Sequence, residues 1–172
     1  MTRPPASLIA LLLLAAAGSA GARSSDRNQP MDVDAASSDC NIGNDAAPCL
    51  LRGDVRIVQG TLKINAATAD LKRAGGDIQR VLLTGGPVRM EQQLDSGELV
   101  RANSSTVDYS LRTDTVVFTG NATLSKPDGS VSGERIVYNM ATGQIQAGGN
   151  GTSERVKLRF LPKNGAGAKG GG

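Results

Sequence analysis

The chain has 172 residues, of which 19 are basic and 16 acidic, with no His and only 2% aromatic residues. The near balance of charge argues against a nucleic-acid-binding protein, which normally carries a larger and more clustered basic excess. The absence of His removes the commonest general base and the commonest metal ligand, which argues against an enzyme or a metal site that depends on that residue.

Residues 1–22 have the features of a cleavable signal peptide. Arg3 supplies a positive charge, and the apolar run from Leu8 to Ala17 is followed by small residues. This run is too short to cross a bilayer but suits the hydrophobic region of a signal peptide. The motif Ala20-Gly-Ala22 predicts cleavage after Ala22, with cleavage after Ala20 as the alternative. We therefore expect the mature chain in an extracytoplasmic space.

The mature chain has the length of one domain, which we expect to span residues 23–160. At its start, residues 23–29 are polar and are expected to be loose. At its end, residues 161–172 have no apolar face and are predicted to be a flexible tail.

Cys40 and Cys49 are the two cysteines of the chain. In an oxidising compartment, a pair this close in sequence is predicted to form a disulfide. Turn formers lie between them at Gly43-Asn-Asp45, so we expect a β-hairpin that the disulfide closes. The spacing differs from the Cys-x-x-Cys motif of redox-active pairs, which favours a structural role.

Apolar and polar side chains alternate along most of the chain, which is the pattern of half-buried β-strands. Alternating apolar positions include Val55 and Ile57, Leu62 and Ile64, Val88 and Met90, Tyr109 and Leu111, Ile136 and Tyr138, and Val156 to Phe160. Turn formers separate the runs at Gln59-Gly60, Gly75-Gly76, Ser96-Gly97, Asp128-Gly129 and Thr142-Gly143. Many short strands at regular spacing predict an all-β sandwich, barrel, jelly roll or solenoid.

A weak internal repeat narrows this choice. Gly53, Gly85 and Gly120 each follow a short apolar segment, and they recur 32 and 35 residues apart. Each is followed by a strand, a turn and another strand, and Gly148 marks a degraded fourth copy. A period of this length indicates stacked β-units that bury their apolar faces against their neighbours. We expect each repeat glycine at a turn or bulge that needs a positive φ.

The ordered segments Gly53–Ala66, Phe118–Leu124 and Gly133–Tyr138 resemble the OstA-like repeat of the LptA family of periplasmic lipopolysaccharide-transport proteins. The resemblance runs from about Gln29 to Phe160. It implies an all-β, twisted, partly open β-jellyroll of repeated antiparallel strand units, in the periplasm, that binds the acyl chains of lipid A in its trough. It also implies end-to-end joining with further copies and with LptC-like inner-membrane and LptD-like outer-membrane partners. The residues between Cys40 and Cys49 depart from the family pattern.

Such a trough needs an aliphatic lining, because each CH₂ group removed from water contributes about 0.8 kcal/mol. We expect the inward-facing apolar residues to form this lining. The alternative is that the same residues fill a closed core, and the sequence does not separate the two. The predicted lining comprises Met31, Val33, Val55, Ile57, Leu62, Ile64, Leu71, Val88, Met90, Tyr109, Leu111, Phe118, Leu124, Ile136 and Tyr138.

Arg73 is the charged residue of most interest in the predicted trough. A regular strand over residues 68–73 places Ala69, Leu71 and Arg73 on one face, which directs the guanidinium toward the apolar side. An Arg in that position suits a phosphate group, and the family resemblance places it facing the trough. The alternative is an ordinary exposed residue before the turn at Gly75-Gly76.

The first and last strands are predicted to be assembly edges, because an unclosed sheet leaves unpaired backbone groups at both ends. Pairing the last strand of one copy with the first strand of the next is a head-to-tail contact that extends into a filament. The alternative for Lys157 and Arg159 is that these cations prevent unwanted pairing. The predicted edge residues are Met31, Asp32, Val33 and Asp34 at one end, and Val156, Lys157, Leu158, Arg159 and Phe160 at the other.

Two rival functions remain open from the sequence. A glycoside-cleaving enzyme would need paired carboxylates, and Asp32 and Asp34 share a strand face, yet no acidic cluster recurs in the repeats. An inert periplasmic scaffold would show the same repeat without lipid affinity. The chain has no nucleotide-binding motif, so we expect a passive, non-enzymatic pathway with no cofactor and no metal.

Overall fold

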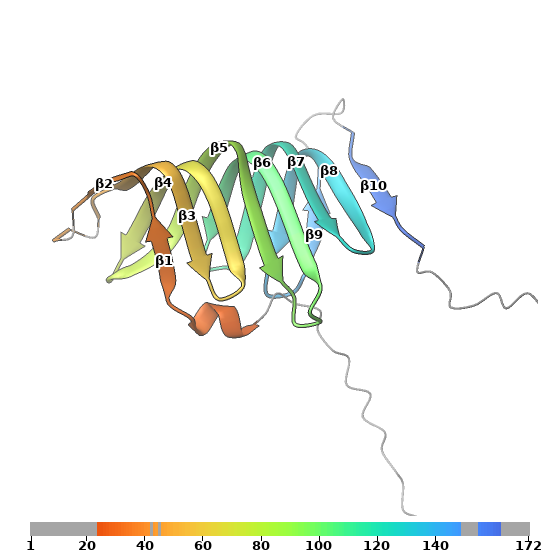
Figure 1. Cartoon of the computed structure of the whole chain (residues 1–172), viewed down its shortest axis with the longest axis horizontal. Helices are drawn as coiled ribbons and strands as arrows, with labels where there is room; N and C mark the ends of the chain where they lie inside the picture. The colour runs from red at the N-terminus through yellow and green to blue at the C-terminus, as the bar shows by residue number, and fades with distance from the viewer. Residues whose placement is uncertain (1–23, 42, 45, 149–154, 163–172) are drawn as a thin grey trace, which may run out of the picture.

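The computed structural model describes residues 24–41, 43–44, 46–148 and 155–162 (Figure 1). The predicted signal peptide and residues 163–172 of the predicted tail lie outside this part of the chain. The described elements are the 3₁₀ helix η1 (Ser24–Asn28) and the strands β1 (Met31–Asp34), β2 (Ser37–Cys40), β3 (Cys49–Gln59), β4 (Leu62–Ala74), β5 (Asp77–Gln93), β6 (Leu99–Ser110), β7 (Thr115–Lys126), β8 (Gly129–Asn139), β9 (Ile145–Ala147) and β10 (Lys157–Phe160).

All ten described strands belong to one antiparallel sheet that does not close on itself. The main path runs β1-β3-β4-β5-β6-β7-β8-β10, while β2 pairs with β3 and β9 pairs with β8. The long strands β3 to β6 are joined by short turns at the predicted Gly60, Gly75 and Gly97, and β7 is joined to β8 at the predicted Asp128-Gly129. The predicted turn at Gly143 joins β8 to the short strand β9. The turn between β6 and β7, at residues 111–114, was not predicted.

Each long strand bends near its middle and so contributes to two walls. The register shifts between Arg52 and Val55, and equivalent shifts recur in the pairs from β4-β5 to β7-β8. Figure 1 shows the bends as arches along the top and the hairpin tips along the bottom. Wall A comprises residues 37–40, 49–52, 68–74, 77–84, 106–110, 115–119, 135–139 and 145–147, and wall B comprises residues 31–34, 55–59, 62–65, 88–93, 99–103, 122–126, 129–132 and 157–160.

The repeat glycines mark the bends of alternate long strands. Gly53 has φ 79° and Gly120 has φ 83°, and each is followed by a residue that also has a positive φ. The prediction of a positive φ is therefore confirmed at these two positions and wrong at Gly85. There, the constraint is space, because an added Cβ would lie 3.0 Å from backbone atoms of Pro87 and Val88.

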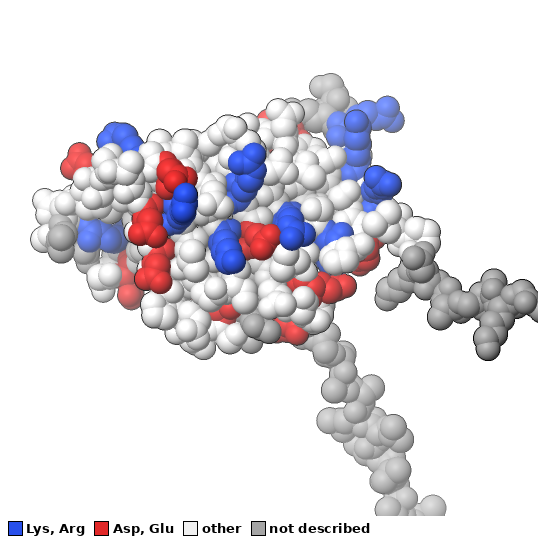
Figure 2. Space-filling model, viewed as in Figure 1, with Lys and Arg blue, Asp and Glu red and all other residues white. Residues whose placement is uncertain are grey.

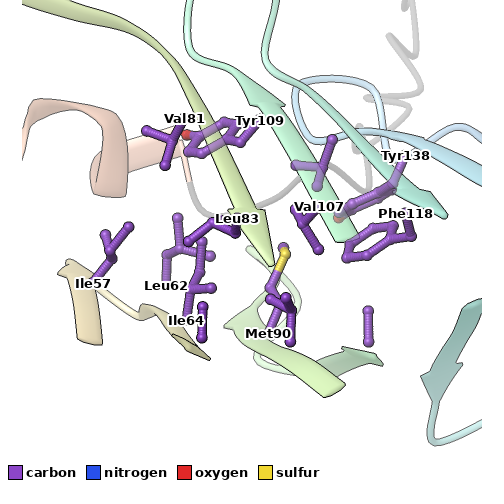
Figure 3. Close-up of a cluster of buried hydrophobic side chains, with 14 of the residues drawn as sticks. Ile57, Leu62, Ile64, Val81, Leu83, Met90, Val107, Tyr109, Phe118 and Tyr138 are labelled. Carbon is purple, nitrogen blue, oxygen red and sulfur yellow. The ribbon is translucent and has the colours of Figure 1, made fainter. Parts of the chain in front are cut away.

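The inner faces of the two walls form a single apolar core (Figure 3). In β3 and β4 the buried positions alternate with exposed ones, as the sequence pattern predicts. Ile57, Leu62, Ile64 and Met90 of wall B lie opposite side chains of wall A in the close-up view. The wall A side chains labelled there are Val81, Leu83, Val107, Tyr109, Phe118 and Tyr138.

The expectation that residues 23–29 are loose is wrong for the described part of this segment. Ser24–Asn28 forms η1, and the side chain of Asp26 is buried, with the residue 3% exposed. A buried carboxylate requires hydrogen-bond donors around it, and here they come from Thr61 in the β3–β4 turn and Gln92 in β5.

The predicted disulfide between Cys40 and Cys49 is confirmed. It joins opposite residues of β2 and β3, which form the predicted antiparallel hairpin. No helix within the described ranges has the length and apolar character needed to cross a membrane.

Replacing Gly120 with Ala should destabilise the fold more than replacing Gly97 with Ala. Both glycines have a φ near 84°, but a Cβ at Gly120 would lie 2.8 Å from the Cβ of Ser105, whereas a Cβ at Gly97 meets nothing within 4 Å. We expect an additional loss of about 1–3 kcal/mol at the bend, because the new atom overpacks it. Urea unfolding of both variants measures this difference, and equal losses would show that the bend tolerates a side chain.

Removal of the disulfide should lower the free energy of unfolding by about 2–3 kcal/mol, because the bond restricts the unfolded chain. The Cys40→Ser, Cys49→Ser double variant and the reduced wild-type protein should give the same value. A thiol assay on denatured, unreduced protein should find no free thiol. Two free thiols per chain would contradict the bond.

Candidate functional site

The structure brings the predicted lining residues onto one continuous inner surface. Twelve of them are buried in the core. Met31, Val33 and Leu111 are partly buried and pack against that core. Side chains fill the interior between the walls, so the alternative of a packed core describes this conformation, and contact of these residues with lipid stays a prediction. The buried twelve are Val55, Ile57, Leu62, Ile64, Leu71, Val88, Met90, Tyr109, Phe118, Leu124, Ile136 and Tyr138.

The interior opens at the end of the sheet formed by β8, β9 and β10. A cavity of about 350 Å³ lies there between the two walls. Leu124 and Val131 line both this cavity and the core, so the cavity continues the apolar interior. Leu158 and Phe160 of β10 face it, although they are 63% and 81% exposed. The remaining apolar side chains around it are those of Ile145, Ala147 and Val156. This C-terminal mouth is therefore an exposed apolar surface.

The opposite end of the sheet is formed by β1 and β2. Arg73 lies here, half-buried, at the end of β4. Its guanidinium Nη2 donates hydrogen bonds to the carbonyl oxygens of Asn41 at 2.6 Å and Asn44 at 3.4 Å. In this conformation Arg73 therefore holds the loop that the disulfide closes. The predicted phosphate-binding role of Arg73 stays a prediction.

Between the hairpin tips of the two walls, polar side chains occupy inward-facing positions of the interior. Gln59 and Gln92 occupy inward-facing positions of wall B and are 7% and 1% exposed. Tyr109 and Tyr138 occupy inward-facing positions of wall A and are 0% and 2% exposed. The Oε1 atoms of both glutamines and the hydroxyl of Tyr138 have no hydrogen-bond partner among the described residues. We call this polar boundary between the wall tips the slot.

Helix η1 lies across the slot and contacts both walls. On wall B, the Asp26 carboxylate accepts hydrogen bonds from Thr61 Oγ1 at 2.5 Å and from Gln92 Nε2 at 3.5 Å. On wall A, the Arg27 guanidinium donates to the Tyr109 hydroxyl and to the Leu111 carbonyl oxygen.

Two further contacts fix η1 over the slot. The Arg27 guanidinium also forms an ion pair with Asp114 and lies 5.6 Å from the centroid of the Tyr109 ring. The segment is close enough to the β3–β4 turn that a Cβ added to Gly60 would lie 2.7 Å from Cγ of Asp26.

The residues of this slot were not predicted as a group from the sequence. Gln59 and Gln92 continue the inward-facing alternation, after Ile57 and after Met90, so the strand pattern could have placed them. Asp26 and Arg27 could not have been found in the same way, because their partners come from residues 35 to 87 positions away in the sequence.

The outer surface carries the charged residues, with opposite signs at the two ends of wall B (Figure 2). The exposed Asp32 and Asp34 project from β1, whereas the exposed Lys157 and Arg159 project from β10. Among the described residues, no group of three or more His, Cys, Asp and Glu side chains is arranged to hold a metal ion.

Comparison with known proteins places this geometry in a family. A family model described as LptA/(LptD N-terminal domain) LPS transport protein matches residues 32–144. The chain belongs to this family. The lipopolysaccharide export system protein LptA of Escherichia coli (strain K12) is 32% identical over 142 residues, which are 81% of this chain and 76% of that protein. The corresponding LptA of Haemophilus influenzae is 31% identical over 161 residues, which are 92% of each chain.

A solved structure of the LptA family shows the same fold. The crystal structure of LptH, the LptA-homologous periplasmic component of the lipopolysaccharide transport device of Pseudomonas aeruginosa, matches with a TM-score of 0.73 and 27% identity. The match covers 80% of this chain and 99% of that chain. The predicted fold class, a partly open β-jellyroll, is therefore confirmed.

The free energy of unfolding should fall between about pH 10 and pH 12 because both tyrosines are buried. Burial raises the pKa of Tyr138 to about 12, and burial also raises the pKa of Tyr109, although Arg27 opposes this. The tyrosines of the unfolded chain ionise near pH 10, at a lower pH than those of the folded chain. Rising pH therefore stabilises the unfolded state relative to the folded state.

Substitution of Tyr138 with Phe should reduce this alkaline decrease in the free energy of unfolding by about 1–2 kcal/mol. The Phe variant should be as stable as the wild type at neutral pH, because the lost hydroxyl has no partner among the described residues. Urea unfolding at neutral and alkaline pH, with phenolate absorbance to follow ionisation, measures both effects. An identical alkaline loss in the variant would contradict the assignment to Tyr138.

Proposed function

We propose that this chain binds lipopolysaccharide in the periplasm by enclosing the acyl chains of lipid A between walls A and B. One observation carries the proposal: the apolar interior continues into an open apolar cavity at the C-terminal mouth, where Leu158 and Phe160 face outward into that opening. Soluble proteins seldom leave large apolar side chains together at a surface unless that surface binds a partner or ligand. Membership in a family of LPS transport proteins supports lipopolysaccharide as this ligand.

The packed interior must widen to accept several acyl chains. The cavity of about 350 Å³ lies near the lower end of the range of about 300–1,000 Å³ that ligand sites usually occupy. The backbone joins the walls through the bends, and η1 joins them by side-chain contacts. A change at the bends with release of the η1 contacts therefore opens the interior. Each CH₂ group that enters contributes about 0.8 kcal/mol, which offsets the loss of side-chain packing.

The two open edges support end-to-end assembly. β1 and β10 are the ends of the main strand path, and each has one side without a strand partner among the described residues. The acidic β1 and the basic β10 are complementary, and opposite charges on paired strands contribute about 0.2–1 kcal/mol each. We propose that one edge joins a further copy or an LptC-like partner at the inner membrane, and the other a further copy or an LptD-like partner at the outer membrane.

An inert scaffold is the competing function. It shares the open edges but gives no reason for exposed apolar side chains at the mouth. The carboxylate pair considered for an enzyme, Asp32 and Asp34, lies exposed on the edge strand β1, outside the apolar interior.

The double variant Leu158→Asp, Phe160→Asp should bind lipopolysaccharide at least about tenfold more weakly than the wild type. Each large apolar side chain buried against lipid contributes about 1.5–3 kcal/mol, and 1.4 kcal/mol is a factor of ten in affinity. Both residues are exposed, so the fold should persist. Leu82→Asp, at a 42% exposed position on the outer face, is the control. Fluorescence titration with labelled lipopolysaccharide measures the affinities, and equal affinity in all three proteins would contradict the proposed mouth.

Charge reversal should test the edge contact. Two double variants should weaken self-association at low salt: Lys157→Asp with Arg159→Asp, and Asp32→Lys with Asp34→Lys. Each double variant places like charges on the two strands that would pair. Mixing the two variants should restore association through the reversed pair. Sedimentation velocity measures the species present, and unchanged self-association of the separate variants would exclude this pairing.

A further inference from the structure

Helix η1 is not part of the sheet, yet it makes the contacts that bridge the two walls across the slot (Figure 1). Its Asp26 holds wall B through Thr61 and Gln92, and its Arg27 holds wall A through Tyr109, the Leu111 carbonyl and Asp114. An acyl chain that enters sideways between the wall tips must pass this segment. We refer to residues 24–29 as the strap.

The slot contains polar groups that an apolar core does not need. A buried polar atom without a partner costs about 1–3 kcal/mol, so such atoms are uncommon in native interiors. Here Gln59 Oε1, Gln92 Oε1 and the Tyr138 hydroxyl are all buried and lack hydrogen-bond partners among the described residues. They come from both walls and lie at inward-facing positions near the strand ends. Their chemistry matches the hydroxyl and amide groups of a sugar.

The strap already satisfies part of this polar row. Gln92 Nε2 donates to the Asp26 carboxylate, Gln59 Nε2 donates to the Gln29 carbonyl oxygen at 3.2 Å, and the Tyr109 hydroxyl accepts from Arg27. The strap therefore presents carboxylate and carbonyl oxygens to donors on the glutamines, as the amide and phosphate oxygens of an amphiphile's polar head would. The glutamine amide groups cannot donate fully to the strap and to a bound polar head at the same time.

We propose that the strap occupies the position of the ligand's polar head. When the acyl chains enter between the walls, Gln59, Gln92 and Tyr109 exchange their hydrogen bonds to the strap for hydrogen bonds to the head. This inference rests on the proposed lipid-binding function and adds the residues that hold the head and the segment that competes with it. Apparent affinity is proportional to the fraction of molecules whose strap is lifted. Weakening the strap therefore raises apparent affinity and speeds uptake.

Two pairs of variants separate competition from a structural role. Arg27→Ala removes the contacts to wall A, and its control, Arg56→Ala, removes an exposed Arg that pairs with Asp54 on the outer face. Gly60→Ala displaces the strap by contact with Asp26, and its control, Gly75→Ala, has nearly the same φ but no atom within 4 Å of the added Cβ. Both members of the second pair carry the same backbone strain, so only the contact with the strap differs.

The experiment measures uptake of fluorescently labelled lipopolysaccharide by the mature chain, residues 23–172, together with hydrogen exchange of the strap. Arg27→Ala and Gly60→Ala should take up lipid about tenfold faster than the wild type, whereas both controls should stay within about twofold of it. Exchange at the Gln29 amide, which donates to the Asp26 carbonyl oxygen, should rise when lipid is added to the wild type.

Three results would overturn the inference. Equal uptake in the strap variants and their controls would show that the strap does not compete. Weaker binding by Arg27→Ala with an intact fold would make the strap part of the ligand site. If the wild type and all variants bind no lipopolysaccharide, the proposed function itself fails. If the wild type binds lipopolysaccharide but the strap variants do not differ from it, only the competition is refuted. The two results therefore distinguish failure of the inference from failure of the proposed function.

Discussion

The bend in each long strand is the constraint on which the rest of the structure depends. Because β3 to β8 each cross from one wall to the other, the apolar residues of both halves of a strand face the same interior. In alternate strands the bend contains a residue with a positive φ, as at Gly53 and Gly120, or lacks a side chain, as at Gly85. A straight sheet of the same sequence would expose one apolar face to water. The fold thus produces a long apolar interior from a single sheet.

A folded sheet of this kind has boundaries of three different types. The arches close one long side with covalent backbone. The two ends leave strand edges and, at β10, apolar side chains exposed, which is the arrangement that a repeating assembly needs. The fourth boundary, the slot, is closed by the polar contacts of Asp26 and Arg27. Polar contacts of this sort can exchange partners at little net cost, whereas the backbone of the arches cannot, which is why we propose opening at the slot.

Much of this arrangement could be predicted from local sequence pattern. Alternation over residues 55–64 and 107–111 places the inward-facing side chains, and the spacing of Gly53 and Gly120 marks the bends, because these signals depend on residues close together in the chain. The strap could not be predicted, since a short polar segment has no periodicity and its order comes from long-range contacts to Thr61 and Tyr109. The turn at residues 111–114 was not predicted because it contains no Gly. Asp114, with φ 51°, adopts there the left-handed conformation that a Gly usually marks.

The measurement that tests the central claim most directly is photo-crosslinking with a benzophenone amino acid at inward and outward positions of the same strand ends. Met90, 3% exposed, and Leu111, packed against the core, represent the inside, while their neighbours Arg89 and Ser110 represent the outside. The account predicts lipopolysaccharide adducts at Met90 and Leu111 and none at Arg89 or Ser110. Folded protein that forms no adduct at either inward position would contradict it, because the interior would then be a core that lipid does not enter.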